Sequence, residues 1–148
     1  MKVVHILFLS CATFLSSSFP QISLASPSGQ KIVTAAQVNG TWRDRSSTFK
    51  VWALGKQRLQ VEFLGIYEYR TAAGPDANTG YGSGIAFIEE DTAVFKPEEG
   101  EEDCTIIMTF GEGKLVVKQE GTCPFGHNVT ATGKYEKVSS QKPKFGEG

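Results

Sequence analysis

The chain has 148 residues, with 15 Lys or Arg against 16 Asp or Glu, so its net charge at neutral pH is only −1. This balance excludes the strongly basic surface that nucleic-acid-binding domains present. The hydrophobic share of 40% and the 16 glycines are typical of a globular domain rich in turns. We therefore expect one folded domain without a nucleic-acid partner.

The first 25 residues have the form of a secretory signal peptide. Lys2 supplies a positive charge, Val3 to Phe19 is apolar or small, and Ala25 completes the small-residue pattern that precedes a cleavage site. Serines interrupt the apolar stretch too early for the roughly 20 apolar residues that a spanning helix requires. We therefore expect residues 1–25 to be removed, the mature chain to be secreted or periplasmic, and no membrane span to remain.

The 123 residues after the signal peptide divide into three parts. We expect residues 26–39 to be a lead-in, residues 40–138 to form a β-barrel domain, and residues 139–148 to be a polar tail. A domain of this length buries enough apolar surface to fold by itself.

The first hairpin is predicted from two runs of alternating apolar residues, 49–53 and 59–63. A three-residue loop at 55–57 pairs the apolar residues of both runs on one face and sets Lys50 opposite Glu62. A two-residue loop would pair charged with apolar positions, so the hydrophobic match decides the register.

The next connection is the longest, and a hairpin follows it. We expect Tyr67 and Tyr69 to extend the inward row of the first hairpin, and residues 71–83 to be a Gly/Pro-rich loop. The runs 84–88 and 92–95, joined by a Glu-Asp turn, predict another hairpin. The sequence does not decide which face of this hairpin points inward, because both faces are partly apolar.

The last hairpin, 104–120, predicts a disulfide bond. A two-residue turn on Gly113-Lys114 has glycine first, as a type II′ turn requires. This register pairs Phe110 with Val117 and sets Cys104 opposite Cys123, within the range of a disulfide. Removal of the signal takes Cys11 away, so an even pair remains in an oxidising compartment.

Two further stretches flank these runs, Gly40-Thr41-Trp42 before them and an alternating run over 129–135 after them. Together they give about eight short strands in a meander. This pattern predicts an all-β fold, a small up-and-down antiparallel β-barrel, with a β-sandwich as the alternative. The expected inward residues are bulky, which favours an interior filled by side chains over a hollow one. They are Trp42, Phe49, Phe63, Tyr67, Tyr69, Met108, Phe110 and Tyr135.

Two resemblances accompany this pattern. Gly40-Thr41-Trp42 resembles the Gly-x-Trp opening of lipocalins and avidins, which are meander barrels. A wider set of stretches comprises Phe49–Val51, Lys56–Val61, Ala77–Gly80, Thr92–Phe95, Cys104–Ile106, Val117–Gly121, Cys123–Val129 and Gly133–Tyr135. Together these stretches resemble a group of small secreted bacterial β-barrel proteins without assigned function, whose related regions accompany lysozyme-inhibitor-like modules. The resemblance implies a bacterial periplasmic or extracellular β-domain and carries over no catalytic residue.

The long connections, 44–47, 71–83, 96–103 and 124–128, fall at one end of such a meander, and the tight turns fall at the other. Binding groups usually sit on loops that a rigid scaffold holds. We therefore expect a non-enzymatic binding module, inhibitor-like in character, for an unknown protein or small-molecule partner. Its expected contacts at the loop end are Arg43, Asp76, Asn78, Tyr81 and His127.

Patterns for catalysis or cofactor binding are weak. The acidic run 98–103 lacks the residue order of an EF-hand, so we expect a solvated loop. His127 is the only histidine after the signal peptide, which excludes a two-histidine zinc site. We expect no enzyme, no metal and no cofactor, and a monomer or weak homo-oligomer. The alternative function is a carrier that holds a small hydrophobic ligand inside the barrel.

Overall fold

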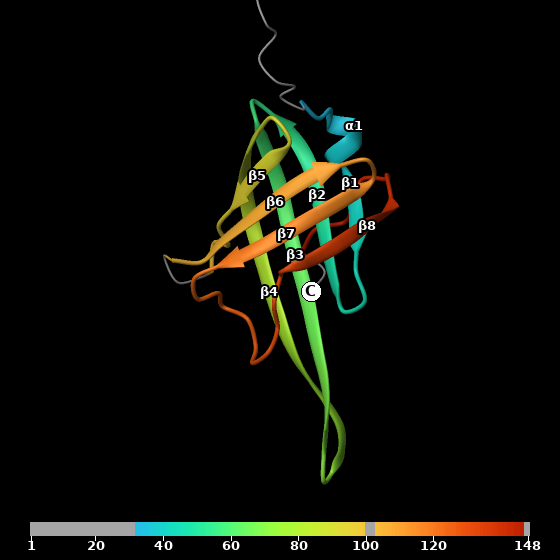
Figure 1. The fold of residues 1–148 in the computed structure, drawn as a ribbon, viewed down its shortest axis with the longest axis vertical. Helices are drawn as coiled ribbons and strands as arrows, with labels where there is room; N and C mark the ends of the chain where they lie inside the picture. The colour runs from blue at the N-terminus through green and yellow to red at the C-terminus, as the bar shows by residue number, and fades with distance from the viewer. Residues whose placement is uncertain (1–31, 100–102, 147–148) are drawn as a thin grey trace, which may run out of the picture.

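The computed structural model describes residues 32–99 and 103–146, and the predicted signal peptide with Cys11 lies outside them. Within the described residues, eight antiparallel strands close into a barrel, with one short helix beside it (Figure 1). In chain order the elements are α1 (Ala35–Val38), β1 (Gly40–Arg43), β2 (Ser47–Gly55), β3 (Arg58–Thr71), β4 (Gly74–Glu89), β5 (Thr92–Phe95), β6 (Thr105–Gly111), β7 (Lys114–Glu120) and β8 (Gly133–Ser139).

Each strand pairs with its neighbours in the sequence, and β8 pairs with β1 to close the barrel. The predicted up-and-down barrel is therefore confirmed over the alternative sandwich. Tight turns join β2 to β3, β4 to β5 and β6 to β7 at one end of the barrel. The longer connections, from β5 to β6 and from β7 to β8, lie at the other end, which we call the loop end.

Side chains fill the interior of the barrel. The rings of Trp42 and Phe110 lie 5.6 Å apart between centroids, and the ring of Phe49 lies 4.9 Å from Phe63 and 5.0 Å from Tyr135. All five of these side chains are buried. Such ring pairs stabilise a core beyond the area that they bury.

The predicted register of the β2–β3 hairpin is confirmed. Val51 pairs with Val61, and Lys50 lies opposite Glu62. The register shifts between Ala53 and Gly55, so that a bulge accommodates the extra residue of the expected three-residue loop.

The predicted register of the β6–β7 hairpin is wrong, although the predicted disulfide is confirmed. Phe110 pairs with Leu115 rather than with Val117, and the turn residues are Glu112 and Gly113. Both turn residues have positive φ, 48° and 77°, which is the pattern of a type I′ turn. The difference is two residues along the partner strand, so every side chain keeps its predicted face. The disulfide joins Cys104 to Cys123 with 4.7 Å between their Cα atoms.

The structure settles the face of the β4–β5 hairpin. Ala86 and Ala93 are buried, whereas Phe87 is 63% exposed. The last strand, β8, begins at Gly133, later than the alternating pattern indicated. Ala131, which precedes it, is nevertheless fully buried.

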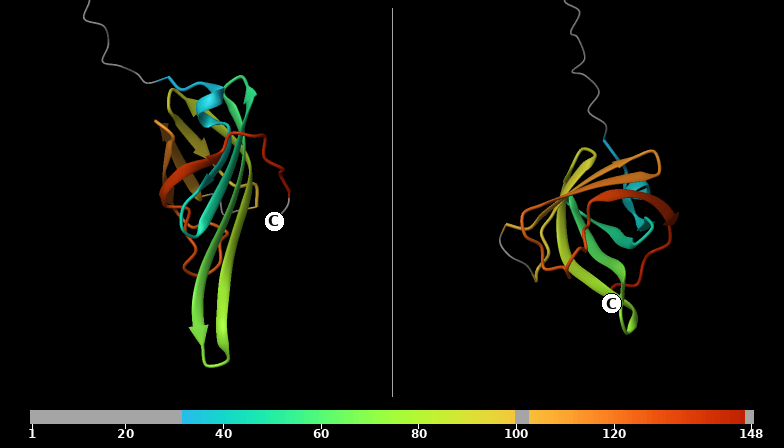
Figure 2. Two further views of the ribbon diagram at one scale, coloured as in Figure 1. Left: turned by 90° about the vertical axis from the view of Figure 1, so that its right-hand side faces the viewer. Right: turned by 60° about the horizontal axis from the view of Figure 1, so that its bottom comes forward.

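The stretch expected to be the longest loop, 71–83, is instead the end of β3, a two-residue turn at 72–73 and the first ten residues of β4. β3 and β4 pair residue for residue from Arg58–Phe87 to Thr71–Gly74. Beyond the Gly65–Gly80 pair they leave the barrel wall as a long two-stranded hairpin (Figure 2). We call residues 66–79 the arm. The Gly/Pro-rich composition had suggested a loop, but every residue from 74 to 83 has a partner on β3.

The two tyrosines expected in the core lie on this arm. Tyr67 is 41% exposed, and its ring stacks on that of Tyr69 with 6.3 Å between centroids. The alternation of side chains continues along β3 past the point where the barrel wall ends. The expectation of two inward tyrosines is therefore wrong, because their strand has left the core.

Two further segments cover the barrel. α1 lies over the end with the tight turns, where the Trp42 indole N–H donates to the Val38 carbonyl at 2.9 Å (Figure 1). After β8, residues 140–146 pass along the outer side of β2 and β3 (Figure 2). We call residues 140–146 the tail segment.

Candidate functional site

The structure brings together two of the five residues that the sequence suggested for binding. The Asn78 side-chain amide on the arm donates to the His127 carbonyl in the β7–β8 connection at 2.8 Å. Arg43 is exposed at the end of β1. Asp76 lies further out on the arm, and Tyr81 lies on the barrel wall. The five residues therefore do not form one site.

Asp76 makes contacts within the arm itself. The Tyr69 hydroxyl donates to Asp76 Oδ2 at 3.0 Å, and the Ala77 N–H donates to Asp76 Oδ1 at 2.8 Å. The hydrogen bond to Asp76 is the main reason why the pKa of Tyr69 is raised. Asp76 thus serves as an internal support of the arm.

A groove runs between the β1–β2 connection and the base of the arm, and we call it the arm groove. Its volume is about 420 Å³. Arg43 is the only residue of the predicted binding set that lines it. The other lining side chains are basic, acidic, polar or apolar and include Asp44, Arg45, Ser46, Ile66, Tyr67 and Glu68.

One wall of the arm groove is held in place by Asp44. Its Oδ1 accepts hydrogen bonds from the N–H groups of Ser46 and Ser47, at 2.8 and 2.6 Å. This is the turn-forming use of an aspartate side chain that favours such positions. The Ser46 carbonyl then accepts the Ile66 N–H at 2.9 Å, which fastens the connection to the arm. The groove is therefore preformed.

The backbone edge of β3 is open along the arm. The N–H of Ile66 points away from β4, because it donates to Ser46. Backbone groups alternate along a strand, so those of Glu68 and Arg70 point the same way. Among the described residues, no backbone group pairs with this edge beyond Ile66.

The opposite edge, on β4, is blocked. Pro75 has no N–H, and the N–H of Ala77 is taken by Asp76. The Thr79 carbonyl accepts the Gly126 N–H at 3.0 Å. Proline, short length and covering loops are the ways in which proteins protect an edge strand from pairing. The protection of β4 alone leaves β3 as the side on which another chain can add.

The side chains around the open edge combine charge with apolar surface. Ile66 is 40% exposed, and Tyr67 beside it is 41% exposed. Arg43 and Arg45 place two guanidinium groups on the far side of the groove. Arginine is suited to bidentate recognition of carboxylates, so an acidic side chain is the natural complement of this wall.

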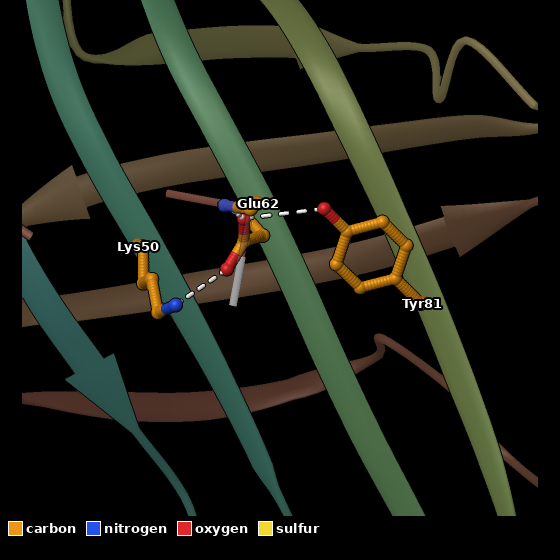
Figure 3. A network of polar contacts seen from close by, with 4 residues as sticks. Lys50, Glu62 and Tyr81 are labelled. Atoms are coloured by element: carbon orange, nitrogen blue, oxygen red, sulfur yellow. Dashed lines mark hydrogen bonds and ion pairs between the residues drawn. The ribbon is translucent and has the colours of Figure 1, made fainter. Parts of the chain in front are cut away.

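A second polar cluster lies on the outer wall of the barrel, centred on Glu62 (Figure 3). Glu62 is only 3% exposed. One of its carboxylate oxygens accepts from Lys50 Nζ at 2.5 Å, and the other accepts from the Tyr81 hydroxyl at 3.2 Å and the Gly146 N–H at 2.6 Å. Sequence reasoning set Lys50 opposite Glu62, but it read 139–148 as a polar tail and gave no sign that this tail covers the pair.

The charge state of Glu62 follows from these contacts. Burial alone raises the pKa of a carboxyl group, because the charged form loses its water. Here the hydrogen bonds from Lys50, Gly146 and Tyr81, together with the charge of Lys50, outweigh burial, and the pKa of Glu62 is lowered. Glu62 is therefore a charged, fully partnered group at neutral pH.

Metal-binding geometry is not found in the part of the chain that the structure describes. Within 32–99 and 103–146, no three His, Cys, Asp or Glu side chains gather as a metal ion would need. Residues 100–102 of the acidic run lie outside the described residues. Over the same described ranges, no helix has the length and apolar character to cross a membrane.

Comparison with known proteins gives no further guide. No protein-family model matches the chain, and no similar curated protein or solved structure was found. Two surfaces of the barrel therefore remain as candidate binding sites, the arm groove with its open edge and the wall around Glu62.

Proposed function

We propose that this protein is a secreted or periplasmic, non-enzymatic binding module of the bacterial envelope that binds an extended segment of a partner protein at the arm. The observation that supports this proposal is the open edge of β3 beside the arm groove. An extended segment that adds to such an edge gains main-chain hydrogen bonds, and neighbouring pockets select its side chains.

The side chains of the groove indicate what the partner segment carries. Its backbone would pair with Glu68 and Arg70, beyond the start of β2 at Ser47. An acidic side chain would complement Arg43 and Arg45. An apolar side chain would cover the exposed surface of Ile66 and Tyr67. The proposed partner segment is thus an extended stretch that alternates acidic and apolar residues.

The packed interior favours this proposal over a small-ligand carrier. A ligand inside the barrel would have to take the place of rings such as Trp42, Phe49 and Phe110, which contact one another and are buried. Displacing such side chains costs the packing that stabilises the fold. The outer edge of the arm needs no such displacement.

The proposal is tested with two matched proline variants at one level of the arm. Glu68 and Ala77 lie directly opposite each other on β3 and β4. Glu68→Pro removes an N–H from the open edge, and Ala77→Pro places proline on the blocked edge. The mature protein and both variants are immobilised and exposed to the secreted proteins of the native host.

We expect a partner that is retained by the parent protein and by Ala77→Pro and lost from Glu68→Pro. Circular dichroism and thermal unfolding establish that both variants keep the barrel. Equal retention of the partner by both proline variants would overturn strand addition at β3, and so would a partner that remains bound when the arm is removed.

A further inference from the structure

The tail segment is held to the barrel in an unusual way. It adds no strand to the sheet. Lys142 and Gly146 contact side chains that project from the outer side of β2 and β3, and Phe145 lines a groove together with residues of β4. A chain held in this manner can leave without breaking the hydrogen-bond ladder of the barrel.

The first anchor of the tail segment is the main-chain N–H of Gly146. It donates to Glu62 Oε2 at 2.6 Å. Glu62 is 3% exposed although its side chain projects outward from the barrel wall, because the tail segment covers it. The barrel itself supplies Lys50 and Tyr81 as partners, and the remaining acceptor position is filled from the tail segment (Figure 3). Any backbone amide in that place would satisfy the same need.

The second anchor is a cation placed over an aromatic ring. Lys142 Nζ lies 5.8 Å from the centroid of the Trp52 ring on β2. An ammonium group within about 6 Å of an indole face is attracted by the ring quadrupole. Trp52 thus recognises the charge of Lys142, and Glu62 recognises the main-chain N–H of Gly146, four residues later.

A groove of about 370 Å³ remains beside the second half of the tail segment. Phe145 lines it together with Glu98 and Ile85, and Ile85 is 37% exposed. Pro143 holds the backbone between the two anchors in the extended range of φ. The groove therefore offers an apolar surface that suits an aromatic residue and a carboxylate that suits a basic residue of a peptide.

We propose that this outer wall is a peptide-binding site that the tail segment occupies as an intramolecular ligand. The ligand class is an extended basic peptide of the form Lys-Pro-Lys-Phe-Gly. Its lysine lies on Trp52, its aromatic residue lies beside Ile85, and the glycine N–H bonds to Glu62. The site is separate from the arm groove and does not depend on the function proposed for the arm.

Intramolecular attachment keeps this site filled in the intact chain. A tethered segment acts at an effective concentration in the millimolar range, so a peptide of moderate affinity does not displace it. Removal of the tail segment should therefore uncover a binding activity that the full chain conceals. That difference between the two forms is what the experiment measures.

The test uses the mature protein and a variant that ends at Ser139, the last residue of β8. Both are titrated with a synthetic peptide of the sequence 140–146, capped at both ends. Binding is followed by tryptophan fluorescence, since Trp42 is fully buried and only Trp52 lies under the peptide. We expect saturable binding to the shortened protein and an apparent affinity for the full chain that is at least tenfold weaker.

Three controls examine the anchors of the peptide. A peptide with Gly146→Pro keeps the charge and lacks the N–H donor, and we expect its affinity to fall at least tenfold. A scrambled peptide of the same composition should not bind. Glu62→Gln in the shortened protein should weaken binding of the parent peptide by at least fivefold, while leaving the proline peptide unaffected.

The proposal is overturned if the shortened, folded protein fails to bind the peptide, or if it binds the scrambled peptide equally well. Should the shortened protein not fold, a protease site placed between Ser139 and Ser140 gives the same information. After cleavage of that folded chain, the segment should remain associated at high protein concentration and be lost on dilution. Immediate loss at every concentration would contradict the proposal.

Discussion

Cys104 and Cys123 are joined although the hairpin between them does not set them opposite each other. The ladder of β6 and β7 ends at the pair Thr105–Glu120, and the next position across from Cys104 would be Gly121. Gly121 has a φ of 74°, and a Cβ there would lie 2.1 Å from the Asp103 carbonyl. The chain turns at this glycine and thereby brings Cys123 to Cys104.

Loss of the disulfide is expected to destabilise the fold without changing it. The bond closes a loop with a sequence separation of 19 residues, which corresponds to about 3 kcal/mol in a chain-entropy description. We expect the double variant Cys104→Ala/Cys123→Ala to lose about 2–4 kcal/mol in urea unfolding. Reduction of the parent protein should give the same loss. Unchanged stability in both would contradict a structural role for the bond.

The filled interior predicts a large difference between two phenylalanines. Phe110 is 1% exposed and contacts Trp42, whereas Phe87 is 63% exposed on the outer side. Phe110→Ala should cost about 3–5 kcal/mol, because it leaves a cavity, and Phe87→Ala should cost about 1 kcal/mol or less. Urea unfolding measures both. Similar small losses would indicate a loosely packed interior, as a carrier would need.

The buried hydroxyl of Tyr135 predicts a second stability difference. It donates to the Ala131 carbonyl at 2.8 Å, and both residues are fully buried. Tyr135→Phe leaves this carbonyl without a donor, which should cost about 1–2 kcal/mol. Tyr69→Phe on the exposed arm is the matched control and should be close to neutral. Equal losses in the two variants would show that burial of the hydroxyl is not the cause.

Removal of the arm should leave the barrel intact. Replacement of residues 68–77 by Asn-Gly keeps the Tyr67–Asn78 pair, whose backbone groups face each other, and closes it with a favoured hairpin turn. A two-stranded ribbon contributes little stability by itself, so the free energy of unfolding should change by less than about 1 kcal/mol. A loss of several kcal/mol, measured with the same urea titration, would mean that the arm is part of the core.

The lowered pKa of Glu62 predicts a pH dependence that its replacement removes. In the unfolded chain this carboxyl titrates near its ordinary value of 4.5, and in the folded protein it titrates lower. Its contribution to stability is therefore fully present above about pH 4.5 and is lost as the pH falls through the folded-state pKa. Lys50, Tyr81 and Glu98 are the other titratable groups that face this site.

Thermal unfolding between pH 7 and pH 3 checks this prediction in the parent protein and in Glu62→Gln. The difference in Tm between them should be constant above pH 5 and should shrink below about 4.5. A constant difference throughout the range would show that Glu62 does not titrate below its ordinary value.

The barrel was predictable because its strands alternate clearly and its turns are short. The β2–β3 register followed from the match of Val51 with Val61, since a loop one residue shorter would have paired charged with apolar positions. The β6–β7 turn was placed wrongly because a glycine-first turn was assumed. The first turn residue is instead Glu112, which has a positive φ although it is not glycine, and no local sequence pattern predicts this conformation.

The arm and the covered glutamate were not predictable for different reasons. Gly, Pro and Asn in β4 indicated a loop, because these residue types are uncommon in strands, yet each of them pairs with a residue of the preceding strand β3. Burial of Glu62 depends on residues 84 positions later in the chain. Pairing across such a separation is a property of the closed fold and leaves no periodic trace in the sequence.

The Gly65–Gly80 pair gives the arm a mechanical property. A Cβ at Gly65 would lie 2.7 Å from the Phe63 ring, and one at Gly80 would lie 2.8 Å from Phe125, so the core presses directly against the backbone there. Both strands continue without a break through this point, so the base of the arm rests directly on the packed interior of the barrel. Bending of the arm at its base would push the backbone against Phe63 and Phe125. The barrel therefore fixes the angle of the arm, and with it the orientation of a segment bound to the arm.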